Sequence, residues 1–199
     1  GGRAGVVSVA SQFGYALDKK DPDVQKRVES VFADLKEMEL KGYRMGAIPA
    51  EQYLLIEKHF GSLKTFFYIE KQKIQTEKDN GVEKSEACLI CHIDGNIVIR
   101  RRKSSGSGPV DVAYKTLQDI ISSKYPKIRE LKLQDFHVGI ARSRAEESTV
   151  RTLINFSDGE EFQTVGVDSN IIESSIQAIA KGFTYYLNKV YKKKQEETP

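Results

Sequence analysis

The residues best suited to bind a small ligand lie in the glycine-rich segment Ser105–Asp111, which reads Ser-Gly-Ser-Gly-Pro-Val-Asp. Its two glycines let the backbone turn sharply or come close to a ligand. Pro109 suits the first position of a helix, and the free N–H groups and positive dipole end of a helix start attract a carboxylate. The segment therefore predicts either a tight strand-to-helix turn or a site for a small α-amino acid. A similar place precedes a second predicted helix, at Thr164–Asn170.

The two cysteines stand in the sequence Cys88-Leu-Ile-Cys91-His92, which matches the attachment pattern of c-type haem. The surrounding residues predict a β-hairpin that turns at Asp94-Gly95, and residues three apart on a strand point to opposite faces. One haem could not easily bridge them, and a zinc site would lack a second pair of ligands. The pattern favours ordinary reduced cysteines and no cofactor or metal in this chain.

Patterns typical of catalysis are missing from the sequence. The histidines, His59, His92 and His137, lie in no H-x-H or H-E-x-x-H arrangement, and there is no P-loop, Rossmann or G-x-S-x-G motif. A complete small enzyme would need a convergent catalytic set that these residues do not supply. We therefore expect no catalytic residues and a chain that is non-catalytic by itself.

Composition narrows the class of protein. The chain has 31 basic and 28 acidic residues and 39% hydrophobic residues, with a mean hydropathy of −0.45. No apolar run approaches the length of a membrane span, so we predict a globular cytoplasmic protein without a membrane partner. The basic run Arg100–Lys103 suggests either a phosphate or nucleic-acid site or a solvated strand edge. Without interleaved aromatic residues it favours the strand edge, and we expect no nucleic-acid partner.

The first third of the chain is predicted to be helical. Apolar residues recur at helical spacing from Val24 to Met38, with Asp21 placed to cap that helix and Pro22 in its first turn. Shorter helices are expected over 4–13 and 50–60. Such a small helical piece has little core of its own. We interpret residues 1–62 as a linker subdomain.

The remaining residues, 63–199, predict a regulatory domain made of two repeats. Each repeat has three strands and a helix, and the first covers 64–124 and the second 128–192. Asp94 aligns with Asp158, and Asp111 with Glu173, at nearly constant spacing. A three-stranded sheet with one helix cannot bury its apolar face alone. We therefore predict an α+β fold in which two β-β-β-α repeats pack into one domain after the helical linker.

Five ordered motifs point to a known family. They are Gly106–Asp111, Tyr125-Pro126, Leu133–Phe136, Thr164–Val167 and Asn170–Ser175. In this order they resemble the C-terminal regulatory domain of the 2-isopropylmalate and (R)-citramalate synthase family. Upstream, Lys41–Tyr43 and Ala50–Leu55 are more similar to the linker of the citramalate synthase branch.

The resemblance implies a homodimer-forming, effector-binding domain of a feedback-inhibited enzyme. The parent enzyme would condense acetyl-CoA with pyruvate on a barrel that uses a divalent metal, and that barrel is absent from this chain. Isoleucine is the expected effector, with a leucine-binding domain of 2-isopropylmalate synthase as the alternative. A purely structural dimerisation module that binds no small molecule is the other alternative.

The resemblance also implies which residues form the effector pocket. The helix start would contribute three residues and the following strands would contribute aliphatic and aromatic walls. The expected residues are Gly108, Val110, Asp111, Leu133, Phe136, Ile140, Val150 and Val167. Ser107 stands where family members commonly have Asn.

Overall fold

The structure is a computed structural model that describes residues 2–43, 48–61, 63–141 and 148–192. It is an α+β protein with three helices followed by two units of three antiparallel strands and a helix. This arrangement confirms the predicted fold class. The predicted boundary residue 62 and the last residues of the predicted regulatory domain, 193–199, lie outside the described residues.

The three N-terminal helices are α1 (Arg3–Gln12), α2 (Pro22–Leu40) and α3 (Pro49–His59). The predicted cap is present: Asp21 accepts a hydrogen bond from the Asp23 N–H, and Pro22 is the first helical residue. These helices pack around a small apolar cluster of their own that includes Val6, Val31 and Ile56.

The first repeat consists of β1 (Phe67–Asp79), β2 (Val82–Ile93), β3 (Asn96–Ser105) and α4 (Pro109–Ser122). Its strands pair in the order β1-β2-β3. Strand β2 begins at Val82 and leads into the predicted hairpin turn at Asp94-Gly95. Its early residues are exposed on both faces, so they lack the alternation of apolar residues by which a strand is recognised.

The second repeat consists of β4 (Lys132–Ala141), β5 (Thr149–Ser157), β6 (Glu161–Asp168) and α5 (Ile171–Leu187). A 3₁₀ turn, η1 (Pro126–Glu130), precedes it and a π-helical turn, η2 (Asn188–Lys192), follows it. Its strands pair in the order β4-β5-β6. The first strand of each repeat carries an irregularity at the matching place, between Ile69 and Lys71 and between Leu133 and Asp135.

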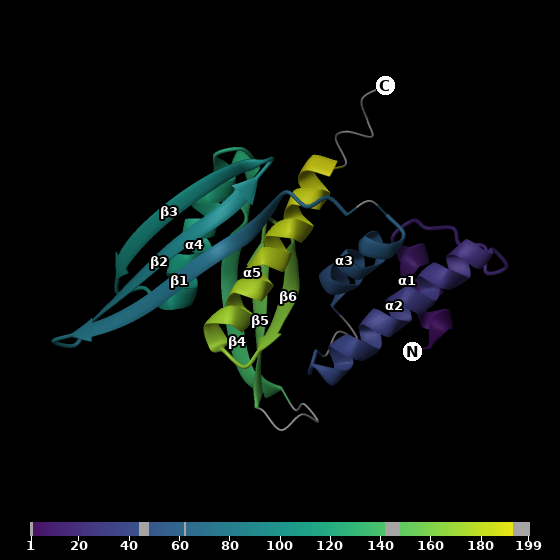
Figure 1. Ribbon diagram of the computed structural model, residues 1–199, viewed down its shortest axis with the longest axis horizontal. Coiled ribbons are helices and arrows are strands. Elements are labelled where there is room, and N and C mark those ends of the chain that lie inside the picture. Colours follow the sequence, from purple (N-terminus) through teal and green to yellow (C-terminus); the bar gives the residue numbers. More distant parts are fainter. Residues whose placement is uncertain (1, 44–47, 62, 142–147, 193–199) are drawn as a thin grey trace.

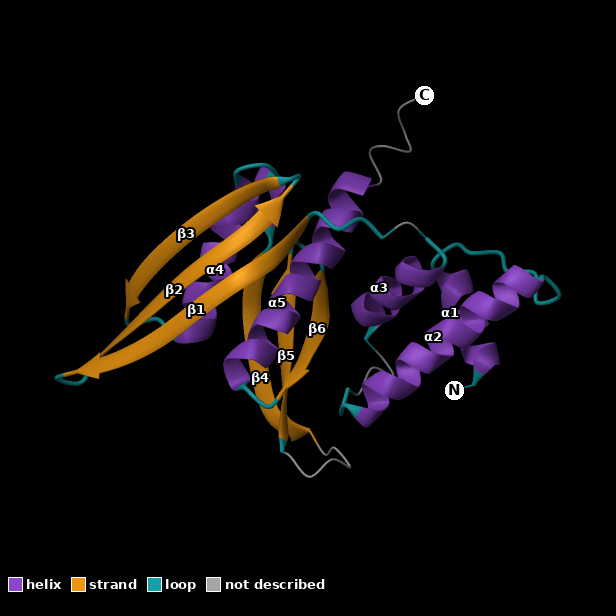
Figure 2. Cartoon of the chain, in the orientation of Figure 1, coloured by secondary structure: helices purple, strands orange, loops and turns teal. Residues whose placement is uncertain are grey.

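The two repeats share one hydrophobic core. Helix α4 packs on the first sheet, α5 packs on the second, and the two helices contact each other, so that they lie between the sheets. Figure 1 shows α5 crossing in front of β4–β6, with the N-terminal helices beside the second repeat. The same layers can be followed by element type in Figure 2.

Helix α5 lies unusually close to its sheet. A Cβ atom on Gly166 of β6 would overlap the backbone carbonyl of Ser174. Beside this contact, Thr152 and Ser174 share a buried hydrogen bond of 2.7 Å. Glycine is therefore required where the helix backbone meets the strand.

Among the described residues, no helix combines the length and the apolar character that a membrane span requires.

Candidate functional site

The predicted effector site begins at the start of α4. Gly108 is the N-cap residue, without a capping side chain, and Pro109 is the first helical residue. Val110 is buried in the shared core, whereas Asp111 lies in the first turn at the helix surface. The first N–H groups of α4 are left without a side-chain acceptor at the cap, which suits an incoming carboxylate.

Helix α4 packs against η1 and Leu131, which lead into the first strand of the second repeat. Gln118 Nε2 donates to the Ile128 and Leu131 carbonyls, each at 2.9 Å, and Tyr114 Oη donates to the Leu131 carbonyl at 2.5 Å. These hydrogen bonds hold α4 against the segment that leads into β4.

One face of β4 carries the aliphatic and aromatic side chains predicted for the pocket wall. Phe136 pairs with Ile154 of β5, and Ile140 pairs with Val150. Directly paired residues of antiparallel strands point to the same face, and Ile154 is fully buried beneath the helices. Phe136 and Ile140 thus point to the helix side, yet they remain 42% and 76% exposed.

The eight predicted residues are not all brought together. Leu133, Phe136, Ile140 and Val150 share the helix-facing side of the second sheet. Val167 pairs with Arg151, one residue from Val150 along β5, and so lies on the opposite side, where it packs near Tyr43. Register could not be read from the sequence. Side chains along a strand alternate between its two faces. Val138 therefore shares the face of Phe136 and Ile140 and belongs to the same wall, where it is 39% exposed.

In the second repeat, the residue that matches Asp111 is a carboxylate that receives a hydrogen bond from within the protein. Glu173 stands 62 positions after Asp111 and occupies the matching turn of α5, where it is hydrogen-bonded by Gln72 of β1. The matched irregularities of β1 and β4, 64 positions apart, make Phe136 the counterpart of Gln72. In the first repeat a phenyl ring therefore replaces the amide that would donate to the helix-start carboxylate.

Asp111 has an acceptor that the protein does not fully satisfy. Its Oδ2 atom is buried and receives no hydrogen bond from the described residues. Lys115 Nζ, one turn along α4, is 2.8 Å from the same oxygen, so the charge is partly balanced although the geometry is not that of a hydrogen bond. A carboxylate in this position can accept a hydrogen bond from a ligand ammonium group.

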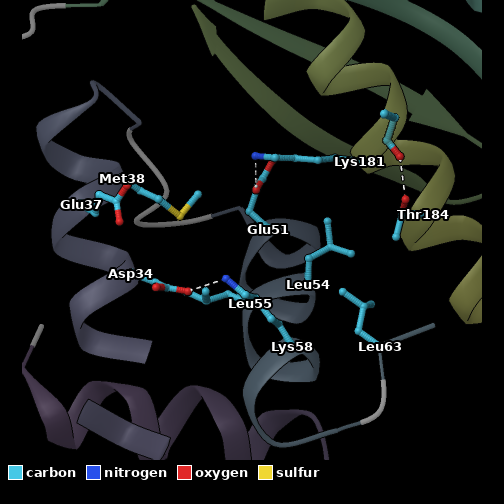
Figure 3. Close-up of a pocket in the computed structure, with 11 residues that line it drawn as sticks. Asp34, Glu37, Met38, Glu51, Leu54, Leu55, Lys58, Leu63, Lys181 and Thr184 are labelled. Carbon is cyan, nitrogen blue, oxygen red and sulfur yellow. Dashed lines mark hydrogen bonds and ion pairs between the residues drawn. The ribbon is translucent and has the colours of Figure 1, made fainter. Parts of the chain in front are cut away.

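A second notable place is a cavity of about 410 Å³ between the N-terminal helices and α5. Its walls include Met38, Leu54 and Thr184, shown as sticks in Figure 3. At its edge the buried carboxylate of Glu51 accepts a hydrogen bond of 2.6 Å from the Val165 N–H. The Lys181 ammonium of α5 lies 2.9 Å from the other Glu51 oxygen, as Figure 3 shows.

A second buried carboxylate adds to the contacts between the N-terminal helices and the end of the second repeat, and we call this set of contacts the joint. Glu57 of α3 accepts a hydrogen bond of 2.7 Å from Tyr15 Oη and lies 2.5 Å from Lys192 Nζ. Tyr43 adds a third contact, because its hydroxyl donates to Gln177 of α5 at 3.1 Å and its ring lies under the Lys181 ammonium. Ion pairs and hydrogen bonds thus join the N-terminal part of the chain to α5 and η2.

The cysteines and histidines form no metal site among the described residues. Cys91 is buried, and burial raises the pKa of its thiol to about 12, whereas Cys88 is half-buried on the other face of β2. The histidines each pair with a carboxylate: His59 with Asp34, His92 with Glu70, and His137 with Asp135.

The basic run on β3 is largely neutralised within the protein. Arg101 and Lys103 both pair with Glu86, and Arg102 pairs with Asp119 of α4. These pairs give Arg101–Lys103 a structural role at the edge of the first sheet.

Comparison with known proteins gives one family and a consistent set of relatives. The family model described as the LeuA allosteric (dimerisation) domain matches residues 46–187. An (R)-citramalate synthase from Aquifex aeolicus is 33% identical over 192 residues, which cover 94% of this chain and 35% of that protein. An (R)-citramalate synthase from Geobacter sulfurreducens is 31% identical, with the same coverage.

A relative of the other branch is more distant. A 2-isopropylmalate synthase from Buchnera aphidicola is 28% identical over 196 residues, 98% of this chain and 34% of that protein. The chain therefore spans about a third of the length of the relatives it matches.

Proposed function

Because the chain belongs to the LeuA allosteric (dimerisation) domain family, we propose that it is the C-terminal, effector-binding part of an (R)-citramalate synthase and that it binds isoleucine as a homodimer. The (R)-citramalate synthases of Aquifex aeolicus and Geobacter sulfurreducens support this branch. The parent enzyme would join acetyl-CoA and pyruvate on a metal-dependent catalytic part.

The observation that carries the proposal is the unsatisfied helix start of the first repeat. The Asp111 carboxylate has a buried oxygen without a hydrogen bond among the described residues, and the first N–H groups of α4 lack a capping side chain. An α-amino acid brings an ammonium group for the first and a carboxylate for the second. Phe136 and Ile140 offer exposed apolar surface for a branched side chain.

Leucine is the alternative effector, and the 2-isopropylmalate synthase of Buchnera aphidicola is the relative that supports it. Isoleucine and leucine differ only in where one methyl group is attached. An apolar pocket separates such ligands by about 1–3 kcal/mol. Effector identity therefore depends on the shape of the wall formed by Leu133, Phe136 and Ile140.

The joint between α5 and the linker offers a route from the effector to the catalytic part. A ligand shifts an equilibrium only by binding one arrangement better than another. Helices α4 and α5 contact each other, and α5 is tied to α3 through Lys181 and Glu51. In this mechanism a shift of α4 on effector binding changes the position of α5 and, through Glu51, that of the linker helices.

The proposal is tested by calorimetric titration of the chain with isoleucine, leucine and valine. Gly108→Val is the blocking variant, because a Cβ at Gly108 meets no atom within 4 Å in the free protein and would occupy the proposed site. Selective isoleucine binding that the variant loses supports the proposal. Selective leucine binding moves the chain to the 2-isopropylmalate synthase branch, and no binding leaves a dimerisation module alone.

A further inference from the structure

The outer edge of β4 differs from the other strand edges of the molecule. Each three-stranded sheet has two edge strands, β1 and β3 in the first sheet and β4 and β6 in the second. Exposed strand edges can pair with another chain, and proteins usually protect them with charged residues or by covering them.

Three of the four edges are protected. Strand β3 carries the basic run Arg100–Lys103, and β1 carries charged residues along most of its length. The edge strand β6 is covered by α3, and the Glu51 side chain accepts a hydrogen bond from the Val165 N–H. In β4, by contrast, the segment Phe136–Ile140 contains no Lys, Arg, Asp or Glu, and each of its five residues is exposed.

We propose that β4 pairs with β4 of a second copy of this chain, in antiparallel orientation around a two-fold axis at Val138. This inference rests on the homodimer of the proposed function and names the surface that forms it. The second copy is the occupant because the segment is complementary to itself. Phe136 lies opposite the partner's Ile140, and His137 lies opposite the partner's Gly139, where the absent side chain leaves room for the imidazole ring.

The same pairing accounts for the exposed apolar side chains. Phe136, Val138 and Ile140 all point to one side of the second sheet, so each meets an apolar residue of the second copy in this register. The two sheets would join into one of six strands, and the edge would disappear.

The test is the oligomeric state of the chain measured by sedimentation velocity over a range of concentrations. Val138→Lys places two ammonium groups opposite each other across the two-fold axis, and like charges in directly opposed positions destabilise a strand pair. We expect the dimer dissociation constant to rise at least tenfold. Ile99→Lys is the matched control, because Ile99 is 63% exposed on an edge strand of the other sheet, and it should leave the dimer unchanged.

A covalent test covers the case in which the lysine variant fails to fold. Val138→Cys should give a disulfide-linked dimer under mild oxidation, and Ile99→Cys should not. A wild-type dimer that Val138→Lys leaves intact, or that Val138→Cys does not cross-link, overturns the β4 contact while the homodimer stands. A monomeric wild-type chain overturns both. Isoleucine titration of the wild-type chain tests the effector proposal separately.

Discussion

The two repeats have the same strand order and the same helix placement, but their helix starts differ. In the second repeat, Asn170 caps α5 by accepting hydrogen bonds from the Ile172 and Glu173 N–H groups, and Gln72 donates to Glu173. In the first repeat, Gly108 offers no cap and Asp111 Oδ2 lacks a hydrogen bond among the described residues. The duplicated fold thus caps the start of α5 with its own side chains, whereas among the described residues no side chain caps the start of α4.

The repeats also differ in how firmly each helix is held. Gly166 lets α5 approach β6 closely, whereas Arg102 stands at the matching position of the first repeat and pairs with Asp119 of α4. Helix α5 further carries Lys181, which forms an ion pair with Glu51 of α3. The second repeat therefore holds its helix closer to the sheet and is joined to α3, whereas the first repeat holds α4 through an ion pair with β3.

The largest expected effect comes from filling the close contact in the second repeat. Gly166→Ala places a methyl group against the Ser174 carbonyl, so α5 must move away from β6. Overpacking of this kind costs about 3 kcal/mol, and urea denaturation followed by circular dichroism measures it.

Gly108→Ala is the control in the first repeat, because its added Cβ meets no atom within 4 Å. Alanine is a poorer N-cap residue than glycine, so we expect the free energy of unfolding to fall by about 1 kcal/mol, well short of the loss in Gly166→Ala. Equal stability of the two variants would show that the close approach of α5 to Gly166 is not a constraint on the fold.

Sequence patterns predict the two repeats, but they do not predict most of the differences between them. The Asp94-Gly95 turn, the Asp21 cap and the order of strands and helices follow from local signals, and the structure confirms them. The contact between Glu51 and Val165 joins residues 114 positions apart. No local pattern indicates such a pair.

The predicted effector residues show the same limit. The family resemblance implies Gly108, Val110 and Asp111 as effector residues, and the structure places all three at the start of α4. The face on which Val150 and Val167 lie depends on strand register, and a shift of one residue reverses it. Spacing alone therefore could not show that these two valines point to opposite sides of the sheet.

The next largest effect concerns the two helix-start carboxylates. Asp111→Asn removes the charge proposed to receive the effector ammonium group, and a hydrogen bond to a charged group contributes about 1.5–3 kcal/mol. We therefore expect isoleucine binding to weaken by roughly 10- to 100-fold in calorimetry. Glu173→Gln is the matched control at the start of α5 and should bind isoleucine as the wild type does. A similar loss in both variants would mean that the site is not confined to the first repeat.

The smallest effect is expected from exchanging the residues that face these carboxylates. Phe136→Gln gives the first repeat the amide that Gln72 supplies in the second, so the new side chain can donate to Asp111 and compete with the effector. A neutral competitor of this kind contributes about 1 kcal/mol, which corresponds to a loss of roughly fivefold in isoleucine affinity. Phe136→Leu keeps the wall apolar and separates this competition from the loss of the ring. If Phe136→Gln and Phe136→Leu weaken isoleucine binding equally, a hydrogen bond from residue 136 to Asp111 plays no part. The uncapped start of α4 would then be the one difference between the two helix starts that matters for isoleucine binding.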